Sequence, residues 1–400
     1  MNKRPSQTRC IGILTSGGDC PGLNAAIRGI AKAAIQEFGI KVIGIKDGFR
    51  GLVENRTIPL EHNDLSGVLT LGGTILGTSR DKPKKMPMGG KVMDMTHTAV
   101  VNARNNGFDC VVCLGGGGTQ KNAYHLNKAG GLDVMTLPKT IDNDVAETDV
   151  TFGFDTAMTT AAEAIDRLHT TATSHDRIIV VELMGHNSGW LALGAGIAGG
   201  ADVILIPEIP YDINAVAEYL LERQRTHGKK FSIIAVAEGA LTKEESGLLK
   251  NGSKKKATHK RKENDYNNYR FGSDKPKPED LLSYKLVQES IASRLGRQLQ
   301  GLTRTEARVT SLGHMQRGGV PTPADRLLCT RLGVKAAELL AEGIYNVLVA
   351  VKNNECVPVP LEKVAGVKKT VPLNHPWIDA ARKVGTCLGV PDKELSSLSQ

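Results

Sequence analysis

The sequence predicts an α/β protein with two Rossmann-like lobes, each built on a mostly parallel sheet covered by helices on both faces. Short β-branched apolar runs alternate with longer Ala-rich segments along the chain, which is the pattern of parallel strands joined by helical crossovers. Glycine-rich turns follow several of the predicted strands. The 400 residues are enough for two domains, and the βαβ pattern occurs in both halves.

The first predicted element is a buried strand at residues 10–14, which ends in a Gly-rich turn at residues 15–22. A helix at residues 25–37 and a second strand at residues 41–45 follow. A strand, a glycine turn and a helix in this order present free backbone N–H groups to a phosphate. The turn lacks the Gly-Lys-Ser/Thr ending of a Walker A loop.

Two more glycine-rich turns are predicted in the same lobe. One covers residues 71–80 and ends at Arg80, whose planar guanidinium can contact a phosphate, although a single arginine can also be a plain surface residue. The other begins at Gly115, after a strand at residues 110–114 and before a helix at residues 120–128. Three such turns at the ends of separate strands predict a phosphate-binding edge.

Residues 138–144, with the sequence Pro-Lys-Thr-Ile-Asp-Asn-Asp, follow a short buried strand at residues 134–137. Ligands of open α/β sheets bind at the carboxyl ends of the strands. There Asp142 can take a proton from a substrate hydroxyl and Asp144 can hold a metal ion, while Lys139 can neutralise phosphate charge. The alternative is an Asx-turn that only caps the next segment.

The second half is predicted to continue the alternation. Helices are expected at residues 156–171, 190–199, 214–225, 278–299 and 325–342, and strands at residues 177–181, 203–206, 232–237, 308–312 and 347–351.

Several polar residues of this half flank strands. His314 and Arg317 lie in a Gly-rich turn that suits a sugar phosphate, or serves only as a structural turn, and Glu238 at a strand end can accept hydrogen bonds from sugar hydroxyls. Arg177 and Arg308 begin strands, so they lie away from the carboxyl-end crevice of their own subunit. They are expected to serve the site of a neighbouring subunit or none.

The net charge of +9 is concentrated in one short polar run, which contains Lys250, Lys254, Lys255, Lys256, Lys260, Arg261 and Lys262. Without this run the chain is nearly balanced, so we expect a solvated surface insertion at about residues 250–275. Aromatic residues make up only 4% of the chain, which argues against base-stacking platforms. A nucleic-acid partner is therefore not favoured.

Cysteine use and hydropathy point to the cytoplasm. The seven cysteines are odd in number and lack the spacing of a disulfide framework. Cys110 and Cys113 are separated by two residues within a predicted strand, where they face opposite sides, so we interpret them as core residues. Residues 1–9 are polar, unlike a signal peptide, and no run of about 18 apolar residues predicts a membrane span.

Four ordered motifs resemble those of the phosphofructokinase family, and the resemblance covers about residues 9–352. The motifs are residues 13–22, residues 138–144, Met184-Gly185, and residues 312–319. The resemblance implies a glycolytic 6-phosphofructokinase that transfers a phosphoryl group from ATP to the 1-hydroxyl of fructose 6-phosphate. It also implies Mg²⁺ as cofactor and an active site in the cleft between the lobes.

The resemblance assigns roles residue by residue. Asp142 is implied as the general base, Lys139 as a stabiliser of the moving phosphoryl group, and Asp144 as the magnesium residue. The implied donor site comprises Gly17, Arg80, Gly116, Gly117, Gly118 and Thr119. The implied sugar-phosphate residues are Thr140, Met184, Gly185, His186, Glu238, His314 and Arg317, joined by Arg177 and Arg308 from a neighbouring subunit of a homodimer or homotetramer.

The implied lobes are discontinuous in sequence. Residues 1–153 with about 317–365 are expected to bind the phosphoryl donor. Residues from about 154 to 316, with 366–400, are expected to bind the sugar phosphate.

Three departures from the family pattern bear on function. Gly117 stands where the family usually has an aspartate for magnesium, His186 stands where many members have an arginine, and the basic insertion has no counterpart in the short bacterial enzymes. A catalytically silent regulatory homologue is one alternative, motivated by Gly117. A nicotinamide-dependent oxidoreductase is another, but no clear Gly-x-Gly-x-x-Gly followed by a ribose-binding acid is present.

The phosphoryl donor depends on two positions. The resemblance implies that an aspartate at the position of Gly118 is typical of pyrophosphate users, where it blocks the α-phosphate of ATP, so Gly118 favours ATP. Lys139 is the pyrophosphate-type residue at its own position, which keeps pyrophosphate as the second candidate.

Overall fold

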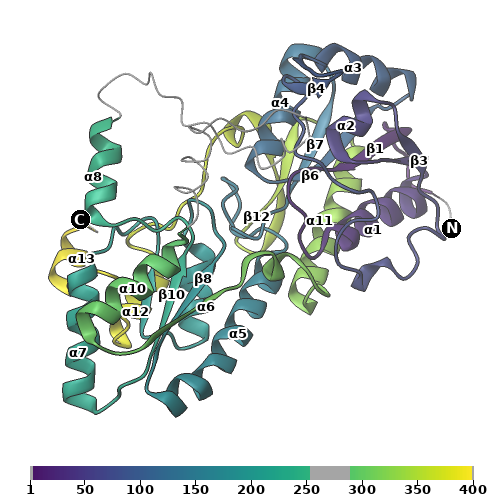
Figure 1. Ribbon diagram of the computed structural model, residues 1–400. Helices are drawn as coiled ribbons and strands as arrows, with labels where there is room; N and C mark the ends of the chain where they lie inside the picture. Colours follow the sequence, from purple (N-terminus) through teal and green to yellow (C-terminus); the bar gives the residue numbers. More distant parts are fainter. Residues whose placement is uncertain (1–2, 253–288, 399–400) are drawn as a thin grey trace. The chain divides into compact units, whose positions relative to one another are not determined.

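The computed structural model describes residues 3–252 and 289–398 (Figure 1). These residues divide into two compact units, the first up to Ala164 together with residues 312–371, and the second comprising residues 165–311 and the chain from Pro372 onward. Most of the predicted basic insertion, from residue 253, lies outside the described residues. The lobe assignment made from the sequence stays a prediction, and each unit is described by itself.

A seven-stranded sheet forms the centre of the first unit, in the order β13-β12-β7-β6-β1-β2-β3. Its strands are β1 Cys10–Thr15, β2 Lys41–Ile45, β3 Thr57–Pro59, β6 Cys110–Gly115, β7 Val134–Pro138, β12 Val347–Lys352 and β13 Glu355–Pro360. The five inner strands are parallel, and β3 and β13 add antiparallel edges. All residues of β1, β6 and β7 are buried, because helices cover both faces.

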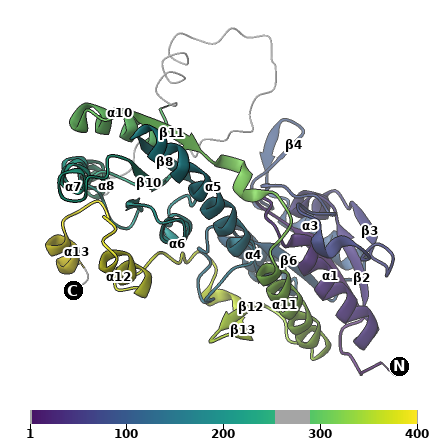
Figure 2. The ribbon, with the colours of Figure 1, turned by 90° about the horizontal axis from the view of Figure 1, so that it is seen from below.

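The helices of this unit are α1 Leu23–Ala33, α2 Gly48–Val53, α3 Thr96–Asn105, α4 Gly117–Gly130 and α11 Pro323–Ala341. Helices α2, α3 and α4 share one apolar core with the sheet. Helices α1 and α11 lie side by side (Figure 2). Gly29 and Gly333 allow this contact, because a Cβ atom at Gly333 would lie 2.6 Å from the backbone of Gly29.

The second unit has a parallel four-stranded sheet in the order β11-β8-β10-β9. Its strands are β8 Ile178–Leu183, β9 Val203–Leu205, β10 Ser232–Ala237 and β11 Ala307–Ser311, and its helices include α6 Trp190–Ala198, α7 Ile213–His227, α8 Lys243–Gly252, α10 Ile291–Thr303, α12 Pro376–Lys383 and α13 Asp392–Leu398. Helices α7 and α10 share an apolar core with the sheet. Gly196 lets α6 approach Ile204 of the sheet closely.

The predicted α/β architecture with mostly parallel sheets is confirmed, while several boundaries differ. Helix α5, Phe154–His175, is longer than predicted. The predicted helix at residues 278–299 begins outside the described residues, and α10 starts at Ile291 because the Ser290 side chain caps it. A small hairpin of β4 Met86–Met88 and β5 Lys91–Met93 was not predicted. Within the described ranges, every helix is too short or too polar to cross a membrane.

Candidate active site

Strand register brings three predicted turns together in the first unit. Strands β7, β6 and β1 are neighbours in the sheet. Thr15 at the end of β1 pairs with Leu114, and Gly115 at the end of β6 pairs with Pro138 at the end of β7. Parallel strands that end in register place their following turns at one edge. The turns that begin at Ser16, Gly116 and Lys139 are therefore adjacent.

The turn after β1 is fixed by hydrogen bonds with Thr78 and Ser79. Gly17 has a φ of +90°, a conformation that favours glycine. Its N–H donates to the Ser79 carbonyl oxygen at 2.9 Å, and its own carbonyl oxygen accepts from the Thr78 hydroxyl at 2.8 Å. Arg80 is exposed and comes directly after Thr78 and Ser79, the two residues that hydrogen-bond to Gly17.

The turn after β6 leads straight into α4, with Gly116 as the N-cap. Among the described residues, nothing lies within 4 Å of a Cβ atom placed on Gly117 or Gly118. The Thr119 hydroxyl donates to the Ser16 carbonyl oxygen at 3.3 Å, which ties this turn to the one after β1. The start of α4 is a suitable place for an anion, and the two glycines leave room beside it.

Lys139 is the buried cation of this edge, with only 4% of its surface exposed. Its ammonium donates a hydrogen bond to the Gly18 carbonyl oxygen. Burial lowers the pKa of the Lys139 ammonium below its usual range, and the guanidinium of Arg317 lowers that pKa as well. The carboxylates of Asp142 and Asp19 act in the opposite direction, so charged groups of both signs meet here.

The turn that carries Asp142 is braced by two threonines. The Thr140 hydroxyl accepts from the backbone N–H of Asp142 at 3.1 Å. The Thr151 hydroxyl donates to the Thr140 carbonyl oxygen at 2.7 Å, and the Thr151 N–H donates to the Asn143 side chain at 3.1 Å. Asn143 adopts a φ of +50°, which is uncommon outside glycine. Asp142 and Asp144 on either side of it are both partly exposed.

Arg317 lies at the same edge, although the sequence assigned it only to the sugar phosphate. It belongs to a 3₁₀ turn, Gly313–Arg317, and its guanidinium donates to the Asp19 carbonyl oxygen at 3.1 Å. A Cβ atom at Gly18 would approach that guanidinium to 2.8 Å. Gly18 therefore has Lys139 at its carbonyl oxygen and Arg317 beside its Cα atom. His314, one turn earlier, is exposed.

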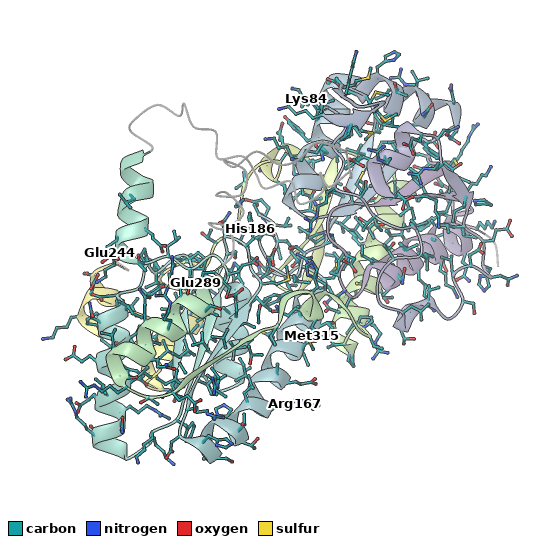
Figure 3. The ribbon with its side chains drawn as sticks, in the orientation of Figure 1. Lys84, Arg167, His186, Glu244, Glu289 and Met315 are labelled. Carbon is teal, nitrogen blue, oxygen red and sulfur yellow. The ribbon has the colours of Figure 1, made fainter. Side chains whose placement is uncertain are left out.

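In the second unit, the loop after β8 meets the end of β10. Gly185 has a φ of +144° and His186 a φ of +49°. The backbone N–H of His186 donates to a carboxylate oxygen of Glu238 at 2.8 Å. Figure 3 labels the exposed side chain of His186 on this loop. Met184, Gly185, His186 and Glu238 are thus brought together by the structure.

Arg177 and Arg308 lie near the starts of β8 and β11, not with that loop. Arg177 Nε donates to Glu306 at 2.5 Å, and Arg308 forms an ion pair with the same carboxylate. Their side chains are 26% and 61% exposed respectively. Glu306 pairs with both arginines, although no local sequence signal marks this residue.

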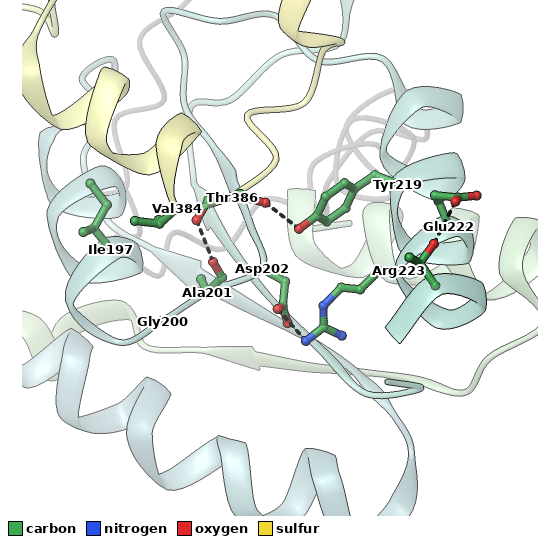
Figure 4. A pocket seen from close by; sticks show the side chains of 11 residues that line it. Ile197, Gly200, Ala201, Asp202, Tyr219, Glu222, Arg223, Val384 and Thr386 are labelled. Atoms are coloured by element: carbon green, nitrogen blue, oxygen red, sulfur yellow. Dashed lines mark hydrogen bonds and ion pairs between the residues drawn. The ribbon is translucent and has the colours of Figure 1, made fainter. Parts of the chain in front are cut away.

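A cavity of about 460 Å³ lies elsewhere in the second unit (Figure 4). Asp202 and Arg223 form an ion pair at 2.8 Å in its wall, and the Tyr219 hydroxyl donates to the Gly385 carbonyl oxygen at 2.7 Å. The described residues that line it include none of the predicted site residues.

The carboxylate oxygens at this edge of the first unit are ligands that suit magnesium. Asp142 and Asp144 offer carboxylate oxygens on one turn, and both are partly exposed. Within the described residues, no three His, Cys, Asp or Glu side chains are grouped as a metal cluster. Mg²⁺ needs no such cluster, because proteins bind it with one or two carboxylates, water and substrate phosphates.

Sequence comparison places the chain among known proteins. Residues 10–340 match the sequence profile of the family described as phosphofructokinase. An ATP-dependent 6-phosphofructokinase of Propionibacterium freudenreichii is 51% identical over 384 residues, covering 95% of this chain and 99% of that protein. One of Spirochaeta thermophila is 51% identical over 391 residues, covering 97% and 99%.

Solved structures show the same fold. The phosphofructokinase of Pichia pastoris in the T-state has a TM-score of 0.72 at 28% identity, covering all of this chain and 39% of the larger one. A pyrophosphate-dependent phosphofructokinase of Nitrosospira multiformis has a TM-score of 0.74 at 17% identity, covering 98% and 92%, which is a likeness of fold. With a profile match over most of its length and relatives at 51% identity, this chain belongs to the phosphofructokinase family.

Proposed function

We propose that this protein is an ATP-dependent 6-phosphofructokinase, which transfers the terminal phosphoryl group of ATP to the 1-hydroxyl of fructose 6-phosphate in glycolysis. Its relatives at 51% identity carry that name. The observation that carries the proposal is the alignment of the ends of β1, β6 and β7. Because of it, the glycine turns after β1 and β6 lie beside the turn after β7, which contains Lys139 and Asp142. A cytoplasmic location accords with this role.

Asp142 is proposed as the general base that removes the proton from the sugar hydroxyl. Its backbone N–H donates to the Thr140 hydroxyl, so the residue lies on a braced turn. Lys139 and the amides of the glycine turns would stabilise charge on the phosphoryl group as it moves, which is the main protein contribution to phosphoryl transfer. The buried setting of Lys139 strengthens this effect, because charges act more strongly away from water.

Magnesium is proposed as the cofactor, held by Asp144 together with water and donor phosphates, where it would neutralise phosphate charge. Gly117 supplies no carboxylate at the position where the family usually has one. The remaining donor residues proposed are Gly17, Arg80, Gly116, Gly118 and Thr119.

The sugar phosphate is proposed to contact Thr140, Met184, Gly185, His186, Glu238, His314 and Arg317. Arg177 and Arg308 are proposed to reach the site of a neighbouring subunit in a homodimer or homotetramer. Both arginines form ion pairs with Glu306, directly before β11. This position supports a role away from the loop that carries His186. The Glu238 carboxylate holds that loop through a backbone N–H.

Pyrophosphate is the second candidate donor, because the buried ammonium of Lys139 is the pyrophosphate-type residue. A steady-state assay of fructose 6-phosphate with ATP and pyrophosphate in parallel, in the presence of magnesium, tests both. Turnover with ATP at a much higher kcat/KM supports the proposal, and a preference for pyrophosphate reverses the donor. Binding of fructose 6-phosphate without turnover from either donor would favour a silent regulatory homologue.

A further inference from the structure

Lys369 reaches the Asp142 turn from a distant part of the chain. Its ammonium donates to the Asn143 side-chain oxygen at 3.1 Å, to the Thr148 carbonyl oxygen at 2.9 Å and to the Asp149 carbonyl oxygen at 2.7 Å. All three acceptors lie between the proposed general base and Thr151. One side chain therefore joins the start of this turn to its end.

The backbone of the same segment reinforces the contact. The N–H of Lys369 donates to the Asp144 carbonyl oxygen at 3.0 Å, and Lys368 forms an antiparallel bridge with Val145. Residues 368 and 369 thus lie along the turn like a short strand. Lys368 has an exposed side chain, whereas that of Lys369 is partly buried.

Burial of an ammonium is costly unless its hydrogen bonds are replaced. The three hydrogen bonds of the Lys369 ammonium replace those that it would make to water. The Lys369 ammonium lies at a turn where Asn143 adopts an uncommon positive φ. A strained backbone of this kind persists where the surrounding structure holds it in place. The three hydrogen bonds from the Lys369 ammonium hold this turn.

We propose that Lys369 is a positioning residue, which holds the turn from Asn143 to Asp149 so that Asp142 meets the substrate hydroxyl in reactive geometry. This inference rests on the proposed kinase function. It extends the active site to the segment around residue 369, beyond the residues that the family motifs cover. The contact acts on Asp142 through the backbone, so its effect falls on the chemical step, whereas substrate binding depends on other residues.

The test compares Lys369→Met with the matched control Lys368→Met in the full-length protein. Both remove one ammonium from adjacent positions, but only the first removes hydrogen bonds to the turn. For Lys369→Met, we expect kcat to fall at least about 10-fold because misplaced reacting groups slow catalysis steeply. The KM values for both substrates should stay within about threefold, and Lys368→Met should match the wild type.

The free energy of unfolding, measured by urea denaturation, is recorded for each variant. If Lys369→Met does not fold, Lys369→Gln takes its place, since the two N–H donors of its amide cannot replace all three hydrogen bonds of the ammonium. A folded variant with wild-type kcat overturns the inference, as does equal loss of kcat in the Lys368 control. Absence of turnover in the wild-type protein instead rejects the proposed function, so the two failures are distinguishable.

Discussion

The buried ammonium of Lys139 donates a hydrogen bond to the carbonyl oxygen of Gly18, which ties the turn after β7 to the turn after β1. These two residues are far apart in sequence, and the β6 strand lies between their strands in the sheet. The contact links a proposed charge-stabilising residue directly to a proposed phosphate-binding loop.

Replacement of Asp142 by serine should reduce kcat by about 10²–10⁴-fold, because general-base catalysis is lost. Binding of fructose 6-phosphate should persist, since the proposed sugar contacts remain. Intrinsic fluorescence can report that binding, because both tryptophans, Trp190 and Trp377, lie together in the second unit and Trp190 follows the His186 loop. Equal losses of binding and turnover would reject the base assignment.

Replacement of Gly118 by aspartate should suppress use of ATP. The described structure leaves open space beside Gly118, and a carboxylate there would meet the α-phosphate of ATP. Gly117→Ala is the matched control, because it adds only a methyl group at the adjacent open position. Unchanged ATP kinetics in Gly118→Asp would refute the steric argument.

Replacement of Asp325 by alanine should lower the free energy of unfolding by about 2–4 kcal/mol, because buried donors lose a charged acceptor. Asp325 accepts from the N–H groups of Gly153 and Thr156 and from the Thr156 hydroxyl, all at 2.6–2.9 Å. It thereby caps the start of α5. Urea denaturation measures the effect. Asp325→Asn keeps one oxygen acceptor and should be milder; an equal loss in both variants would contradict the capping role.

The thiols should react slowly in the native protein near neutral pH. Burial raises the pKa of all seven cysteines, that of Cys387 to about 11. Only the thiolate reacts, so a raised pKa leaves less reactive species at any pH below it. For the partly exposed Cys387, alkylation should speed up about tenfold per pH unit from pH 7 to 9, because this range lies well below its pKa of about 11. Fast labelling at pH 7 would contradict this expectation.

The inner parallel strands and the glycine turns after β1 and β6 could be predicted from the sequence, because each depends on a local pattern of apolar and glycine residues. The turn at residues 71–80 was wrongly expected to follow a strand, since a 3₁₀ turn, Val68–Thr70, precedes it. The adjacency of Lys139 to Gly18 follows from strand order, which a local pattern leaves open. The edge strands β3 and β13 were missed because each is short or only partly buried. Edge strands of this kind lack the continuous apolar run that identifies an inner strand.

The placement of Arg317 and Lys369 could not be predicted for a different reason. Each reaches the site through contacts with residues far away along the chain, so no neighbouring sequence signal marks either contact. Glu306 is similar, because its importance comes from two arginines on separate strands. Single charged residues of this kind acquire a meaning only once the fold has brought their partners to them.

The first unit is assembled from two stretches of chain, since α11 and β12 come from residues 312–371 and pack on elements formed before residue 165. During translation, the ribosome must therefore make the whole intervening segment before β12 can join β7. Until then the nascent sheet exposes the edge of β7 and the face of α1 that later contacts α11. Apolar surfaces and unpaired strand edges that are exposed during folding promote aggregation. The expression yield of this protein should therefore depend on the supply of chaperones.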